Sequence, residues 1–139
     1  MLAFLYAKIA YIPKEIWLQG HPQWDNSWTN LGTYTNVAGS LNYVTFEDFP
    51  DHELYFEMIG KTDAGTGYWQ LYNSTDGEAM ANSEIYSSST DPIRLRSGSI
   101  PKPEGAKTII VQHKIVGGNG TTEYVNSIMS RIVFRLPPL

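Results

Sequence analysis

The feature that most constrains the fold is an alternation of apolar and polar residues with a period of two. In residues 53–61, Leu54, Phe56 and Met58 fall on one face, whereas Glu57 and other polar residues fall on the opposite face. The same alternation returns in four later segments, residues 68–72, 93–96, 107–116 and 124–136. Strands with one buried and one solvated face have this period. The second half of the chain is therefore predicted to form β-strands.

Clusters of Gly, Pro, Asn and Asp, which favour turns, separate these segments: residues 63–67, 73–77, 101–105 and 116–120. The strands on either side of the first cluster are expected to pair as a hairpin. With weaker segments elsewhere, the total is about eight or nine strands, the number that a double-sheet jelly roll uses. No segment predicts a helix. The expected fold class is all-β, an antiparallel β-sandwich of jelly-roll type.

The first 30 residues lack this regular pattern and are rich in aromatic side chains. We therefore expect two parts, an N-terminal arm or docking segment at residues 1–30 and the β-sandwich at residues 31–139. A chain of 139 residues is long enough to bury one hydrophobic core.

Composition excludes several classes of function. The chain has no cysteine, which rules out disulfides, thiolate metal sites and cysteine nucleophiles. Its net charge of −4 repels phosphate, so neither nucleic acid nor an anionic membrane is an expected partner. The apolar start, residues 1–7, has no preceding basic region and is followed by Lys8, which argues against a signal peptide. No apolar run approaches the roughly 20 residues of a membrane span.

Residues suited to catalysis are sparse. Three histidines lie far apart in the sequence: His21, His52 and His113. His113 falls on the inward face of its predicted strand and is expected in the core. Four acids share one loop, Glu47, Asp48, Asp51 and Glu53, but their spacing matches no calcium loop, and a solvated turn is the simpler interpretation. We expect no enzyme activity, no cofactor and no metal site.

The aromatic residues are the strongest candidates for a binding role, because exposed rings stack on sugars and are enriched at protein interfaces. Trp17, Trp24, Trp28 and Tyr34 gather in the least regular segment. Within the strands, Trp69 is expected in the core, whereas three tyrosines are expected to point outward: Tyr55, Tyr68 and Tyr72.

Four stretches carry a resemblance to known proteins: YFEMIGKTDAGTGYWQLYN, SEIYSSSTDPIRLRSGSI, KTIIVQHKIVGGNG and the closing RIVFRL. From residue 54 to residue 134 the chain resembles a jelly-roll module found in virion fibre and decoration proteins and in extracellular carbohydrate-binding modules. The likeness rests on strand pattern and turn chemistry. It implies the fold, and it assigns no binding residue by position.

Two hypotheses follow from the resemblance and the aromatic residues. The first is a non-enzymatic virion structural protein that decorates the capsid exterior of a bacteriophage or archaeal virus. Its partners are the capsid protein or copies of itself, as a homo-oligomer such as a trimer, and its location is the virion surface. The arm would dock through six residues: Phe4, Tyr6, Ile9, Trp17, Trp24 and Trp28.

The second hypothesis is an extracellular carbohydrate-binding module. In this case Tyr68 and Tyr72 stack on a glycan together with Trp24 and Trp28, and nearby Asn and Asp side chains bind the sugar hydroxyls. This hypothesis predicts a monomer that binds glycans.

Overall fold

The computed structural model describes residues 14–19 and 27–137. Along the chain its elements are β1 (Lys14–Gln19), β2 (Ser27–Thr29), β3 (Thr35–Asn36), β4 (Asn42–Thr45), the 3-10 helix η1 (Phe46–Asp48), β5 (Glu53–Thr62), β6 (Thr66–Asn73), β7 (Glu78–Ala79), β8 (Ile85–Ser87), β9 (Ile93–Arg96), β10 (Ala106–Val116) and β11 (Val125–Arg135). No helix in these ranges is long and apolar enough to cross a membrane.

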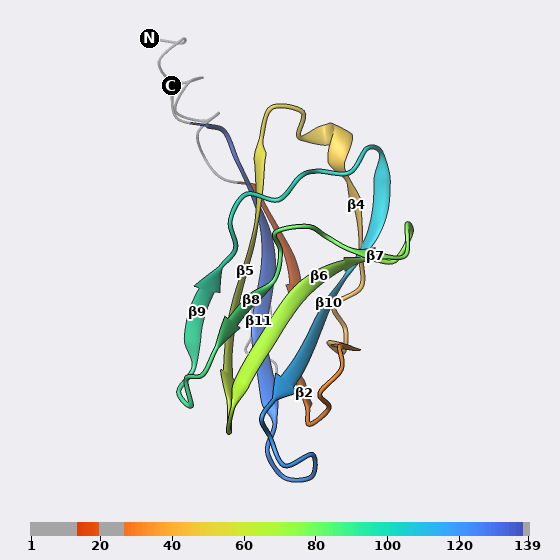
Figure 1. Cartoon of the computed structure of the whole chain (residues 1–139). Coiled ribbons are helices and arrows are strands. Elements are labelled where there is room, and N and C mark those ends of the chain that lie inside the picture. Colours follow the sequence, from red (N-terminus) through yellow and green to blue (C-terminus); the bar gives the residue numbers. More distant parts are fainter. Residues whose placement is uncertain (1–13, 20–26, 138–139) are drawn as a thin grey trace.

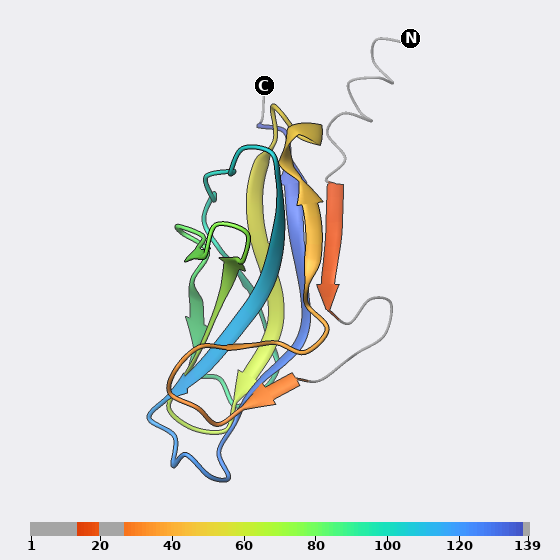
Figure 2. The same ribbon diagram turned by 90° about the vertical axis from the view of Figure 1, so that its right-hand side faces the viewer.

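The strands form two antiparallel sheets that pack face to face, as Figures 1 and 2 show. The first, here called the β11 sheet, has the order β1-β11-β5-β9, and β2 also pairs with β11. The second, the β10 sheet, has the order β3-β10-β6-β7, with β4 also on β10 and β8 also on β6. The predicted fold class, an all-β sandwich, is confirmed.

The core lies between the sheets and is built by the alternation seen in the sequence. Leu54 and Phe56 of β5 are fully buried, and so are Trp69 and Leu71 of β6. On β10 the inward side chains are three aliphatic residues and a histidine: Ile109, Val111, His113 and Ile115. Because alternate residues of a strand point to opposite sides, the remaining side chains of these strands point away from the core.

The hairpin expected between β5 and β6 is wrong. β5 pairs with β11 and β9, whereas β6 pairs with β10, β7 and β8. The turn at residues 63–65 therefore crosses from one sheet to the other. At this corner the sheets come so close that a Cβ on Gly60 would lie 2.6 Å from Cζ2 of Trp69. Alternation shows which face of a strand is buried. Two strands that pair as a hairpin and two strands that pack in opposite sheets have the same alternation, so the pattern could not distinguish them.

Two strands lie within residues 1–30, the segment expected to form an arm. β1 pairs with β11 along its length, and its Leu18 is part of the core. β2 pairs with β11 through residues 27–29. Residues 1–13 and 20–26 lie outside the described residues. The described part has more strands than the sequence predicted because several, such as β3 and β7, have only two residues.

Candidate functional site

A serine and a histidine, a pair common in catalytic sites, lie in contact inside the sandwich. Ser127 Oγ accepts a hydrogen bond from Trp69 Nε1 at 2.8 Å and lies 2.8 Å from His113 Nδ1. His113 is only 1% exposed, and burial lowers its pKa to about 4, so the imidazole is neutral at pH 7. Both side chains are buried, so the core position predicted for His113 is confirmed.

The acidic loop does not gather its carboxylates around one point. Glu47 and Asp48 belong to η1, whereas Glu53 begins β5 and accepts a hydrogen bond from Tyr55 Oη at 2.5 Å. Within residues 14–19 and 27–137, no three His, Cys, Asp or Glu side chains come together as metal ligands.

The outer face of the β10 sheet carries tyrosines and amides in registered rows, and we call it the tyrosine–amide face. It comprises Tyr34, Asn36, Tyr68, Gln70, Tyr72, Glu84, Tyr86, Gln112 and Lys114. The strand pairing sets Lys114 beside Tyr68 and Tyr68 beside Tyr86. The Tyr68 and Tyr86 rings are 5.6 Å apart, and Tyr86 is 65% exposed. Two neighbouring strands thus present adjacent aromatic rings to solvent.

Lys114 links a third tyrosine to this pair. Its Nζ lies 4.5 Å from the ring centroid of Tyr34 and 5.1 Å from that of Tyr68, within the range of cation–π attraction. Tyr34 Oη donates a hydrogen bond of 2.6 Å to Glu84, which lies next to β8. Burial and this carboxylate raise the pKa of Tyr34 well above its usual value, so the hydroxyl stays protonated. These contacts hold the rings in place before any ligand arrives.

A chain of side-chain amides lies next to the tyrosines. Gln70 Nε2 donates to Gln112 Oε1 at 2.9 Å, and Gln112 Nε2 donates to Asn36 Oδ1 at 3.1 Å. An amide has both donor and acceptor groups. The face therefore combines aromatic surface with fixed groups that can bind hydroxyls.

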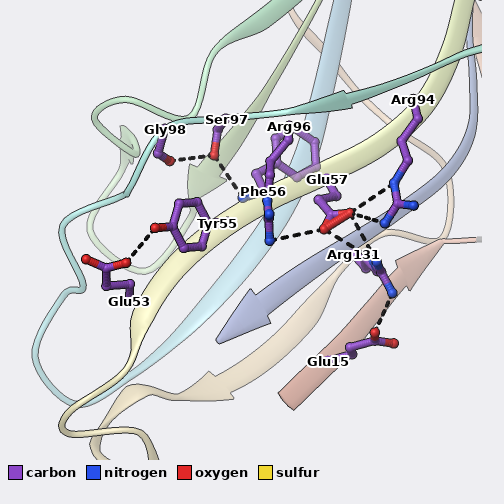
Figure 3. A network of polar contacts seen from close by, with 10 residues as sticks. All are labelled: Glu15, Glu53, Tyr55, Phe56, Glu57, Arg94, Arg96, Ser97, Gly98 and Arg131. Atoms are coloured by element: carbon purple, nitrogen blue, oxygen red, sulfur yellow. Dashed lines mark hydrogen bonds and ion pairs between the residues drawn. The ribbon is translucent and has the colours of Figure 1, made fainter. Parts of the chain in front are cut away.

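The outer face of the β11 sheet, here called the arginine face, is different in chemistry. Strand pairing sets Trp17, Arg131, Glu57 and Arg96 in one row across β1, β11, β5 and β9. Figure 3 shows Arg94, Arg96 and Arg131 converging on the Glu57 carboxylate. The closest contact joins Arg94 Nη2 to Glu57 Oε2 at 2.6 Å. Arg131 also binds Glu15 of β1, at 2.5 Å.

The sequence predicted that Glu57 lies on a solvated face. Its side chain does lie on the outward face, but it is only 5% exposed, because the arginines cover it. Burial by itself raises the pKa of this carboxyl, but the hydrogen bonds and charges of Arg94 and Arg131 outweigh burial and hold the pKa below its usual value. Glu57 is therefore ionised at neutral pH and fixes the arginines.

The residues predicted for docking are only partly within the described structure. Phe4, Tyr6, Ile9 and Trp24 lie outside it. Trp17 lies on the arginine face, where the Arg131 guanidinium sits 5.4 Å from the ring centroid. Trp28 of β2 is 60% exposed and is registered with Asn126 of β11.

Of the residues predicted for sugar stacking, Tyr68 and Tyr72 lie together on the outer face of the β10 sheet. Trp28 belongs to the opposite sheet and does not join them. Sequence reasoning missed Tyr86, whose outward position shows only in the short segment 85–87, and the arginine cluster, whose members come from segments that are far apart.

Solved structures resemble this fold at low sequence identity. One is the CBM36-1 domain of a multidomain xylanase from the hindgut metagenome of Trinervitermes trinervoides, with a TM-score of 0.54, 12% identity, and coverage of 92% of this chain and 100% of that one. Another is the carbohydrate-binding module CBM6cm-2 of Cellvibrio mixtus lichenase 5A, solved with cellotriose, with a TM-score of 0.50, 12% identity, and coverage of 86% and 95%.

A third similar structure is that of infectious bursal disease virus, Gx strain, with a TM-score of 0.50 and 12% identity. The match covers 88% of this chain but 31% of the viral one. The sequence matches no protein-family model, and no curated protein matches it. These likenesses support the β-sandwich fold and the pattern-level resemblance to both groups, and they do not decide between binding functions.

Proposed function

We propose that the protein is a non-catalytic carbohydrate-binding module that holds a neutral glycan on the tyrosine–amide face. The observation that carries the proposal is the Tyr68–Tyr86 pair, with Tyr86 exposed and Tyr68 half-buried, beside the amide chain of Gln70 and Gln112. Sugar rings have an apolar face that packs on aromatic rings, and hydroxyls that pair with amides and charged groups.

Two further features support this assignment. Tyr72 shares β6 with Tyr68 and Gln70 on the same side, so aromatic and amide groups alternate along one strand. Lys114 and Tyr34 are held by contacts within the protein, so little side-chain freedom is lost when a ligand binds. The match with carbohydrate-binding modules also spans those domains almost completely.

The experiment is a screen of neutral oligosaccharides, cello-oligosaccharides and xylo-oligosaccharides among them, followed by calorimetry on any that bind. Replacing Tyr86 with alanine should weaken binding by about tenfold, since a central aromatic contact contributes about 1.4 kcal/mol to the binding free energy. Tyr86 is mostly solvent-exposed, so the fold should not change. The matched control is Trp28→Ala, which removes an exposed ring from the opposite sheet. Equal losses in both variants, or no glycan binding at all, would contradict the proposal.

Capsid decoration is the second candidate. It is favoured by Trp28, a large aromatic side chain that is 60% exposed, because such rings anchor protein interfaces. In this case the outer side of β2 docks on a capsid or a second copy, and the location is the virion surface.

Light scattering on the full chain tests the self-association part of this candidate. A defined oligomer that the Trp28→Ser change converts to a monomer supports it, whereas a monomer in both proteins removes self-association. In the latter case, docking on a separate capsid protein would need that protein as the probe.

A further inference from the structure

All four arginines of the chain lie on the arginine face: Arg94, Arg96, Arg131 and Arg135. With Lys61, the described residues place five basic side chains on this face against three acidic ones, Glu15, Glu53 and Glu57. The chain as a whole has 14 acidic and 10 basic residues. The arginine face is therefore positive on a negatively charged molecule, which favours an anionic ligand there.

A shallow depression of about 180 Å³ lies beside the cluster. Its lining combines Arg94, Arg131 and the Glu57 carboxylate with Trp17, Ile59 and Met129. It therefore offers guanidinium groups next to carbon surface and an indole ring. A ligand that fits both kinds of surface has an anionic group attached to a ring or another apolar body.

The carboxylates of the protein leave part of the guanidinium capacity unused. Arg94 binds Glu57 Oε2 through Nε at 3.2 Å and Nη2 at 2.6 Å, and its side chain is 65% exposed. A guanidinium has five N–H donors, so the Nη1 group of Arg94 takes part in neither bond. In the cluster itself, Glu15 and Glu57 face three guanidinium groups. One positive charge is left over.

We propose that this depression binds a carboxylate carried on a sugar-sized ring, such as a uronic acid residue. The ligand carboxylate pairs with the exposed edge of Arg94, because a guanidinium matches a carboxylate in a planar, two-bond geometry. The ring packs on Trp17 and Ile59. The site is on the opposite sheet from the tyrosine–amide face, so it does not depend on the glycan binding proposed there.

The test is a titration of the full chain with D-glucuronate, followed by nuclear magnetic resonance. D-glucose serves as the neutral ring, and inorganic sulfate as the anion without a ring. We expect glucuronate to shift the Trp17 indole and Arg94 Nε–H signals in a saturable way, with the buried Trp69 indole as the internal reference. Glucose should cause no such shift, and sulfate should bind at least about fivefold more weakly than glucuronate.

Two substitutions separate binding from general charge. Arg94→Gln should remove the glucuronate response, whereas Arg135→Gln, which deletes the same charge on the same face away from the depression, should leave most of it. Glu57→Gln should lower the melting temperature yet raise glucuronate affinity by about fivefold, since the internal competitor for the guanidinium donors loses its charge. A purely structural cluster would lose stability with no gain in affinity.

Four results would overturn the proposal. The first is no shift at Trp17 with glucuronate, and the second is an equal shift with glucose. The third is an equal loss of the response in the Arg94 and Arg135 variants. Equal affinities for sulfate and glucuronate would exclude the ring contact and leave a simple anion site in its place. If Glu57→Gln fails to fold, the Arg94→Gln variant still tests the proposal. Arg96 and Arg131 still pair with Glu57 in that variant, so it should fold.

Discussion

Two titratable side chains inside the described structure, one from each sheet, show two opposite ways of burying a polar group. Glu57 lies under arginines that keep it charged, whereas burial keeps His113, whose Nδ1 lies beside the Ser127 hydroxyl, neutral. A buried charge is tolerated when opposite charges and hydrogen bonds replace the lost water. Glu57 therefore holds a surface together, and His113 behaves as a core side chain that resists protonation.

His113 predicts a specific loss of stability in mild acid. Its pKa is about 4 in the folded protein against an ordinary value of 6.5, so below pH 6.5 the unfolded chain takes up the proton more readily. The free energy of unfolding should fall as the pH drops from 6.5 towards 4, by about 3 kcal/mol in all from this group. Chemical denaturation at a series of pH values measures the effect.

Carboxylates also titrate in this range, so a variant must isolate the histidine. His113→Gln keeps a polar side chain beside Ser127 and removes the titration. Its unfolding free energy should depend less on pH than that of the parent protein between pH 6.5 and 4. Parallel curves for the two proteins would show that His113 is protonated in the folded state at its ordinary pKa.

At the scale of elements, the corner between β5 and β6 depends on a glycine. A Cβ on Gly60 would lie 2.6 Å from Trp69 Cζ2 and 2.7 Å from the Asn126 carbonyl oxygen. Gly60→Ala should therefore lower the free energy of unfolding by about 1–3 kcal/mol, the usual cost of overpacking. Urea denaturation gives the value. Gly98→Ala is the control, because nothing lies within 4 Å of its added Cβ, and a similar loss in both would refute the close approach.

The sequence predicted the strands well and their partners poorly. Segments 93–96 and 107–116 match β9 and β10 closely because each strand shows its own alternation. Whether β6 packs across the core from β5 or pairs with it in one sheet depends on contacts between distant segments, which a periodic pattern does not contain.

The same reasoning explains what was found of the candidate sites. Tyr68 and Tyr72 were predicted to face outward from the alternation in β6, and they do. The cluster of Arg94, Arg131 and Glu57 was not predicted, since its members meet only through the pairing of β5 with β9 and β11. The local sequence indicated this cluster only through Arg94 and Arg96, which alternate with apolar residues in one strand.

At the scale of the whole molecule, the two outer faces of the sandwich carry opposite kinds of chemistry. The β10 sheet presents tyrosines and amides, and the β11 sheet presents arginines. Because the core separates the faces, a substitution on one is not expected to change binding on the other. Tyr86→Ala and Arg94→Gln are thus mutual controls.

Salt should separate the two faces in the same protein. Raising sodium chloride from about 0.01 M to about 1 M shortens the Debye length from about 30 Å to about 3 Å. Glucuronate binding at the exposed Arg94 should weaken by about tenfold over this range, because it depends on charge. Binding of a neutral oligosaccharide at Tyr86 should change by less than about twofold, since stacking and amide contacts involve no net charge. Calorimetry at the two salt concentrations measures both, and an equal salt dependence would mean that the ligands share one charged site.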